Sequence, residues 1–333
     1  MASLAQGSQI GVTSLYITID TEYSFGMARR MGGGGRAENF ASAIIGLTPT
    51  GPLGIHYQMD QFDAHGIKAV FFVDPMPALV WGTEAIADVV GPIVARGHDV
   101  QLHLHSEWLE IAGSANPLGT RTGGNLRDFG FEEQCTLIDY ARDVLIAAGA
   151  PAPAAFRAGN YGANDDTLRA LAELGIAYDT SHCPGIAVSE CQISLGPTDR
   201  HVQRHCDTIE VPIGCIAAPG GGLRHYQLTA LTDGELLAAL CHAVRAEQQQ
   251  VTMVSHSFEL LSRDRSRANR IVQRRFDRLC AGLGKIAGLT SATYALNPPV
   301  AEPASPALLP HSPLRTWRRY AEQALGNALY GAK

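Results

Sequence analysis

The feature that most constrains the fold is an alternation of helical and short apolar segments, repeated at least five times along the chain. Apolar residues recur every three or four positions over about 55–65, 83–97, 131–149, 164–175 and 232–248. Each of these segments leads into an apolar, strand-like run such as 69–73 or 251–254. Repeated helix–strand units predict right-handed crossovers and a parallel sheet with helices outside it.

A first strand over 14–20 precedes these units, and no Gly-x-Gly-x-x-Gly fingerprint follows it. The number of units therefore favours an α/β fold of the distorted (β/α)7–8 barrel type, with TIM-like parallel strands and outer helices, over a dinucleotide-binding sheet. We expect the glycine-rich stretch 23–52 to be a flexible loop. The barrel is expected to span residues 12–296, followed by a Pro-rich linker and a C-terminal helical appendage over 297–333.

Composition narrows the class of protein. Hydrophobic residues make up 46% and charged residues 17%, as in a folded enzyme-sized body. The net charge of −6 gives no basic excess, so we expect no nucleic-acid partner. Seven cysteines without a CxxC pair, no signal-peptide pattern and no transmembrane segment indicate a cytoplasmic protein. The sequence leaves open whether the chains form a homo-oligomer.

Polar residues capable of chemistry stand where the predicted strands end. They are Asp20, Glu22, His103, His105, Glu107, Arg157, Asp179 and His256. In a barrel these ends open on one face. The period of two along a strand places His103 and His105 on the same side. Two imidazoles with a carboxylate from another strand are the ligand set of a catalytic zinc site, whose third ligand would be Asp20 or Glu22. The alternative is a pair of ordinary histidines at a strand edge.

Six short motifs, in order, carry a family resemblance. They lie between about Leu15 and Leu261 and read TID-TE, FFVD, GHDVQLHLHSEW, FRAGNYG, YDTSH and VSHSFEL. In this order they resemble the polysaccharide deacetylase family, the NodB-like carbohydrate esterases of family 4 type. The resemblance implies a metal-dependent hydrolase that removes an acyl group, such as N-acetyl, from an amino sugar.

The resemblance also implies roles for single residues. Asp20 matches the general base and also remains a candidate metal ligand, while Glu22 matches the neighbouring metal-binding acid. His103 matches the first metal histidine. Arg157 matches the arginine that orients the base, and Asp179 matches the acid of the fourth motif. His256 matches the histidine that protonates the leaving amine.

Two departures from the family pattern touch the metal. Thr21 separates the two acids of the first motif, and Glu107 stands where the family has its second histidine. Either His105 or Glu107 therefore completes the site. We expect His105, because zinc prefers imidazole and the strand directs this side chain inward. The expected cofactor is one divalent metal per chain, with Zn2+ as the expected ion.

Further residues are candidates for substrate binding. We expect Trp108 and Tyr161 to stack on a sugar, with Asn160 and Asp179 beside them, although aromatic residues at strand ends also pack barrel rims. The arginines between 262 and 279 indicate a solvated helix face or, alternatively, a phosphate site. The expected substrate is an amino sugar or a carrier-linked sugar, a precursor in surface-polysaccharide biosynthesis. The alternatives are a catalytically decayed sugar-binding barrel and an amidase of small non-sugar amides.

Overall fold

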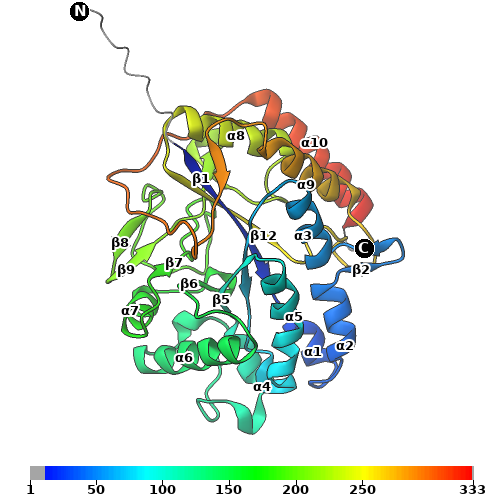
Figure 1. The fold of residues 1–333 in the computed structure, drawn as a ribbon, viewed down its shortest axis with the longest axis vertical. Coiled ribbons are helices and arrows are strands. Elements are labelled where there is room, and N and C mark those ends of the chain that lie inside the picture. Colours follow the sequence, from blue (N-terminus) through cyan, green and yellow to red (C-terminus); the bar gives the residue numbers. More distant parts are fainter. Residues whose placement is uncertain (1–11, 332–333) are drawn as a thin grey trace, which may run out of the picture.

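The computed structural model describes residues 12–331, whose centre is a curled, mostly parallel sheet (Figure 1). Seven parallel strands follow one another in the order β12 (Gln250–His256), β1 (Thr13–Thr21), β4 (Val70–Val73), β5 (Asp99–Leu104), β6 (Ala155–Ala158), β7 (Tyr178–Asp179) and β9 (Thr208–Glu210). An antiparallel strand, β8 (Gln203–His205), forms the edge, and β13 (Leu289–Ser291) pairs with β1. The sheet forms a half-barrel with helices around it, so the predicted distorted TIM-like barrel is confirmed.

The helices include α3 (Ile55–Ala64), α5 (Thr83–Ala95), α6 (Phe131–Ala147), α7 (Asp165–Glu173), α8 (Asp233–Arg245), α9 (Arg270–Leu283) and α10 (Pro313–Tyr330). Five of these helices, α3 and α5 to α8, lie where the apolar periodicity predicts them, and α10 lies in the expected C-terminal appendage. Side chains cap two of these helices at their N-termini. The Asn164 side chain accepts from the amide of Thr167 at 3.1 Å. Thr232 and Glu235 form a reciprocal capping box at the start of α8, which fixes where this helix begins.

The glycine-rich stretch 23–52 is structured, so the prediction of a flexible loop is wrong. It contains α1 (Phe25–Arg30), α2 (Arg36–Asn39), a π-helical turn (Phe40–Ile44) and a small hairpin, β2 (Leu47–Thr48) with β3 (Gly51–Pro52). The buried Asn39 side chain accepts from the amide of Ser24 at 2.8 Å and donates to its carbonyl at 2.9 Å. Long-range contacts such as this one, and that of Trp81 Nε1 with the Gly33 carbonyl, fix the stretch, and residue composition does not reveal them.

Two side-chain faces alternate along the central strands. Leu15, Ile17 and Ile19 of β1 belong to the main core packed against the helices, whereas Tyr16 belongs to a second cluster inside the half-barrel. Asp20 lies on the same face of β1 as Tyr16, because the two residues are four positions apart along the strand. Asp20 also pairs in register with His256 of β12. Polar side chains at these positions therefore point into the mouth of the half-barrel at the carboxyl ends of its strands.

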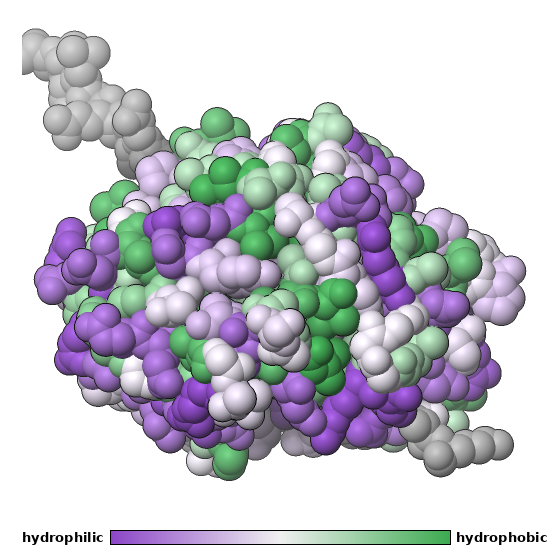
Figure 2. Space-filling model, turned by 90° about the horizontal axis from the view of Figure 1, so that it is seen from below, coloured by the Kyte–Doolittle hydropathy of each residue, from purple (hydrophilic) through white to green (hydrophobic). Residues whose placement is uncertain are grey.

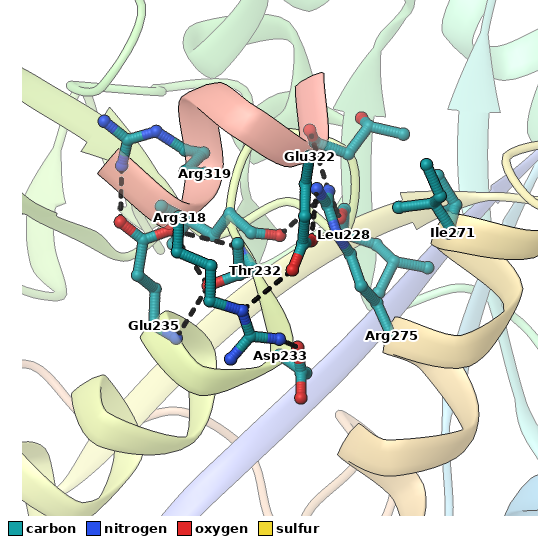
Figure 3. A network of polar contacts seen from close by, with 12 residues as sticks. Leu228, Thr232, Asp233, Glu235, Ile271, Arg275, Arg318, Arg319 and Glu322 are labelled. Carbon is teal, nitrogen blue, oxygen red and sulfur yellow. Dashed lines mark hydrogen bonds and ion pairs between the residues drawn. The ribbon is translucent and has the colours of Figure 1, made fainter. Parts of the chain in front are cut away.

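The C-terminal residues lie against the barrel. The Glu302 amide donates to the Val202 carbonyl at 2.7 Å, and the Ala217 amide donates to the Leu309 carbonyl at 3.1 Å. Helix α10 then crosses the outer face beside α8 and α9, and ion pairs hold it there (Figures 1 and 3). The boundary at 296 stays a prediction, but the segment after it makes regular contacts with the rest of the structure. Within residues 12–331, no helix is long and apolar enough to cross a membrane.

Candidate active site

A small pocket opens at the carboxyl ends of the strands, on the side of the molecule toward which β1 runs. Its volume is about 80 Å³. Hydrophilic and apolar residues are mixed on the surface of this end of the molecule, which Figure 2 shows from below. The pocket is lined by Asp20, Glu22, His103, His105, Ala158, Asn160, Tyr161 and His256. Seven of these eight residues are the site candidates named from the sequence. A pocket of this size accepts a group of a few atoms, while a larger substrate would lie at its mouth.

Three of the lining residues could hold a metal ion. One ligand atom each of Glu22, His103 and His105 lies within 4.8 Å of the others. The Nε2 atom of His103 is 3.4 Å from a Glu22 carboxylate oxygen, and the Nε2 atom of His105 contacts the same oxygen. These ligand types, two imidazoles and one carboxylate from β5 and the end of β1, suit a catalytic zinc site. Asp20 lies outside this group.

Neighbouring acceptors fix the orientation of both imidazoles. The Nδ1 atom of His103 lies 2.7 Å from the Arg157 carbonyl, so this nitrogen carries the proton and donates it. The Nδ1 atom of His105 lies 3.0 Å from a carboxylate oxygen of Glu107. In each ring, Nε2 is then the nitrogen that offers a lone pair toward Glu22. Glu107 acts behind His105, in the position of an outer carboxylate that orients a metal-binding histidine.

The charges of this group are mutually dependent. Burial alone would raise the pKa of Glu22, but His105 and His103 hold this pKa well below its usual range. Burial alone would lower the pKa of His105, but Glu22 and Glu107 hold it well above its usual range. The group therefore keeps a charged carboxylate beside a basic imidazole with little solvent. A cation bound among these atoms would replace the proton on His105, so the donor set fits a divalent metal.

Asp20 lies beside the metal-binding group and is held by Arg157. The two side chains form a buried ion pair between β1 and β6. Arg157 also donates from Nε to the Thr180 carbonyl at 3.2 Å, and its guanidinium lies 4.4 Å from the centre of the Phe72 ring. Burial lowers the pKa of Arg157, but Asp20 outweighs this effect and raises it, which keeps the guanidinium charged. These contacts fix Arg157, which in turn holds the carboxylate of Asp20 in place.

His256 faces Asp20 from the end of β12. Its Nε2 atom is 3.9 Å from an Asp20 oxygen, and its Nδ1 atom is 3.4 Å from a Glu259 oxygen. Burial lowers the pKa of His256, but Glu259 and Asp20 raise it to about 9. Glu259 in turn accepts hydrogen bonds from Ser255 at 2.6 Å and Thr229 at 3.0 Å. The imidazole is thus a proton donor at neutral pH, oriented by a buried acid.

Sequence reasoning missed two buried acids next to the pocket. Glu259 was part of the VSHSFEL motif but received no role, although its position three residues after His256 on a turn was a usable signal. Asp74 ends the FFVD motif after β4. One of its oxygens lies 3.1 Å from the amide of Met76, and the other has no partner among the described residues. Burial raises the pKa of Asp74 to about 6.

Two predicted substrate contacts are wrong. The Trp108 side chain is fully buried, and its ring packs 5.8 Å from Phe25 and 5.2 Å from Trp81 in edge-on geometry, so it belongs to the core under the loops. Asp179 is also fully buried. Its two oxygens accept from the amide and the hydroxyl of Ser181 at 2.9 and 2.8 Å, which fixes the end of β7 away from the pocket.

Asn160 and Tyr161 do line the pocket. Both have positive φ angles, 56° and 57°, directly after the arginine strand β6. Two consecutive residues other than glycine in this region are costly, by about 1–3 kcal/mol each, and such strain is frequent at functional sites. The unusual backbone turns these two residues over the pocket instead of continuing the strand.

Comparisons with known proteins bear on the fold. No protein-family model matches the chain, and no curated protein sequence matches it. Among solved structures, the chain is similar to a putative polysaccharide deacetylase from Mycobacterium smegmatis, with a TM-score of 0.52 and 16% identity over 88% of this chain and 91% of that one. It is also similar to a 4-alpha-glucanotransferase from Thermococcus litoralis, with a TM-score of 0.50 and 10% identity over 91% of this chain and 43% of that one.

The two solved structures share one architecture, but their names give different reactions. The fold alone therefore does not assign the reaction, which has to rest on the side chains at the carboxyl ends of the strands. The similarity to the Mycobacterium smegmatis structure agrees with the six sequence motifs. The chain has the NodB-like fold of the polysaccharide deacetylases.

Proposed function

We propose that this protein is a metal-dependent hydrolase that removes an acyl group, N-acetyl in the first instance, from an amino sugar. The observation that carries the proposal is the convergence of Nε2 of His103 and of His105 on one Glu22 oxygen, with Asp20 and His256 in the same pocket. Hydrolysis of an amide needs an activated water, a stabilised oxyanion and a proton for the departing amine. The pocket holds a candidate for each of these needs.

Glu22, His103 and His105 would hold the divalent cation, with Zn2+ as the proposed ion. Such a cation, when bound, lowers the pKa of water and stabilises the oxyanion. Asp20 takes the proton from the attacking water, because Arg157 holds its carboxylate at the edge of the metal-binding group. His256 gives its proton to the leaving nitrogen, and Glu259 keeps the imidazole turned toward the pocket.

The substrate class follows from the size of the pocket and the family likeness. A pocket of about 80 Å³ accommodates an acyl group but not a sugar ring, so the ring would lie outside, near Asn160 and Tyr161. We propose a free or carrier-linked amino sugar used as a precursor in surface-polysaccharide biosynthesis. The motifs shared with deacetylases support a sugar over a small amide.

The test is acetate release from a panel of substrates by the metal-loaded protein. The panel contains free N-acetylhexosamines, the same sugars on nucleoside diphosphate and on lipid pyrophosphate, and small non-sugar amides. We expect release from at least one amino sugar, reduced by about 10²–10⁴-fold in Asp20→Asn. His65→Ala, at an exposed residue at the end of α3, is the matched control and should retain full activity.

Two results would contradict the proposal. Release from small amides alone would make the protein an amidase. Sugar binding without release, unchanged in Asp20→Asn, would make it a decayed sugar-binding barrel.

A further inference from the structure

Helix α10 presents an apolar face to solvent. Its large apolar side chains are exposed by 77% at Leu314, 70% at Trp317, 52% at Tyr320, 52% at Leu325 and 47% at Leu329. Ala321, Ala324 and Ala328 are also exposed and lie between them on the same side, since residues three or four apart share a helix face. Arg318, four residues after Leu314, is the charged residue within this arc, and it is paired with Asp233 of α8.

The opposite face of α10 is polar and packs against the barrel, the reverse of an ordinary surface helix. Arg319 pairs with Glu235 of α8 at 2.5 Å, and both side chains are 1% exposed. Arg318 pairs with Asp233 at 2.5 Å, and Glu322 pairs with Arg275 of α9 at 2.9 Å (Figure 3). The helix is therefore held by charges, and its apolar face has no function in the fold of this chain.

Arginines border this apolar face on the side of α9. Arg270, Arg274 and Arg278 are exposed and four residues apart, so they form one row along α9. A groove of about 190 Å³ between the two helices is lined by Arg274 and Arg278 together with Leu325 of α10. Arg267 continues the row, because its guanidinium donates to the Leu329 carbonyl at 2.5 Å and lies 5.6 Å from the centre of the Tyr330 ring.

The arginine row is largely unneutralised. Within the described residues, Arg267, Arg270 and Arg274 form no ion pair with a carboxylate, and Arg278 has only a 3.7 Å contact with Asp233. Arg275 is the exception, since it is buried in the contact with α10. An excess of positive charge thus lies beside an exposed apolar helix on a protein whose net charge is −6.

We propose that the α9–α10 surface, made of the apolar face of α10 and the arginine row on α9, docks on an anionic lipid bilayer. An amphipathic helix with flanking basic residues lies in the plane of the interface, its apolar side inserted about 5–10 Å and its cations at the phosphates. A second copy of the chain is a less favourable partner for this surface. A two-fold pair with antiparallel α10 helices would bring like-charged arginine rows together.

The polar contacts on the inner side of α10 also favour a lipid bilayer as the partner of this surface. A helix that docks by ion pairs keeps its position when its outer side chains enter a lipid phase, because no part of its own core is exposed by that transfer. The inference does not depend on the proposed reaction, since lipid binding is measured without substrate and with variants outside the pocket.

The test is binding of the full chain to vesicles of phosphatidylglycerol and phosphatidylcholine, compared with phosphatidylcholine alone, by co-sedimentation at two salt concentrations. We expect binding to the anionic vesicles that weakens with salt. Trp317 supplies a second readout. Because Trp108 is fully buried and Trp317 is 70% exposed, insertion should shift the tryptophan emission to shorter wavelength, and Trp317→Phe should keep the binding but lose most of the shift.

Two pairs of variants separate the contributions. The double variant Trp317→Ser, Leu325→Ser should lower the partition coefficient at least tenfold, whereas Val188→Ser, at a residue 93% exposed elsewhere, should leave it unchanged. The double variant Arg270→Gln, Arg274→Gln should lower it about 25-fold, or about fivefold per arginine. Arg30→Gln with Arg204→Gln, also exposed, is the control of equal charge.

Two outcomes would overturn the proposal. One is equal binding of the parent chain and the α10 double variant to anionic vesicles. The other is a stable dimer of the parent chain that the α10 double variant converts to a monomer, with no binding to either vesicle. That result would assign the surface to a second copy.

Discussion

Two clusters of buried charges lie in different parts of this molecule, the pocket at the strand ends and the contact that holds α10. The second cluster, called here the helix clamp, consists of Arg318, Arg319 and Glu322 of α10 with Asp233, Glu235 and Arg275. Both clusters join distant segments, and both contain ion pairs that are almost fully excluded from solvent. Burial and pairing alone therefore do not distinguish a site from a structural contact.

The difference lies in the types of side chain and in what surrounds them. The clamp pairs guanidinium groups with carboxylates, although Nε and Nη2 of buried Arg319 have no hydrogen-bond partner among the described residues. The pocket adds imidazoles, whose Nδ1 atoms are engaged from behind and whose Nε2 atoms turn toward one carboxylate. Its imidazoles also border an open volume. Four clamp residues line the groove between α9 and α10, but the central pair of Arg319 and Glu235 is closed over. A cluster of charges is a site when its ligand or proton-transfer atoms face a space that a small molecule can enter.

The largest expected effect is a loss of bound metal, which changes in the pocket should cause and changes in the clamp should not. We expect about one divalent metal per chain, lost in His103→Ala and in His105→Ala together with at least about 10³-fold of the activity, because two of three ligands cannot hold a catalytic cation. Elemental analysis after exhaustive dialysis checks the metal, and His65→Ala is the control. Metal retained by both variants would remove these residues from the metal site.

Breaking the clamp should cost stability and leave the chemistry intact. In Arg319→Ala, the carboxylate of Glu235 is left buried without its partner, which costs about 3–5 kcal/mol of unfolding free energy. Urea unfolding measures this loss, and the activity per folded molecule should stay at the parent value. The double variant Arg319→Met, Glu235→Leu should recover part of the stability, since a buried pair is often replaceable by apolar residues, but it also loses the capping contact of Glu235 with Thr232. A single variant as stable as the parent would show that the clamp does not hold α10.

The contrast between the clusters also explains what sequence reasoning could reach. Asp20, His103, Arg157 and His256 stand at strand ends, where the period of two and the order of the motifs predict their convergence. The clamp could not be predicted, because Arg319 and Glu235 are 84 residues apart and each looks like an ordinary surface residue of an amphipathic helix. The prediction that Trp108 stacks on a sugar was wrong for a related reason. The residues next to Trp108 in the sequence do not show that Phe25 and Trp81 pack over it.

The outer carboxylate of the pocket is expected to have a smaller effect than the ligands. Glu107 accepts from His105 at 3.0 Å and so fixes the imidazole. In Glu107→Gln the metal affinity should fall by about 10–100-fold, as for other groups that orient a metal ligand. The activity at saturating metal should stay near that of the parent. Competition with a chelator measures the affinity. Complete loss of metal would instead make Glu107 a ligand and would reopen the choice between it and His105.

The smallest expected effect concerns the pH limit set by His256. Its pKa is raised to about 9, so the proton that the leaving amine needs is present below this pH and is lost as the pH rises through about 9. Activity should therefore fall on the alkaline side. In Glu259→Gln, burial still lowers this pKa while the acid that raises it is gone, so the alkaline limit should move at least about one unit down, with activity near pH 6 little changed. The pH profile of kcat checks this shift, and Glu190→Gln, at an exposed acid paired with Arg127, is the control. An unmoved limit would mean that Glu259 orients His256 without setting its charge, or that another group donates the proton.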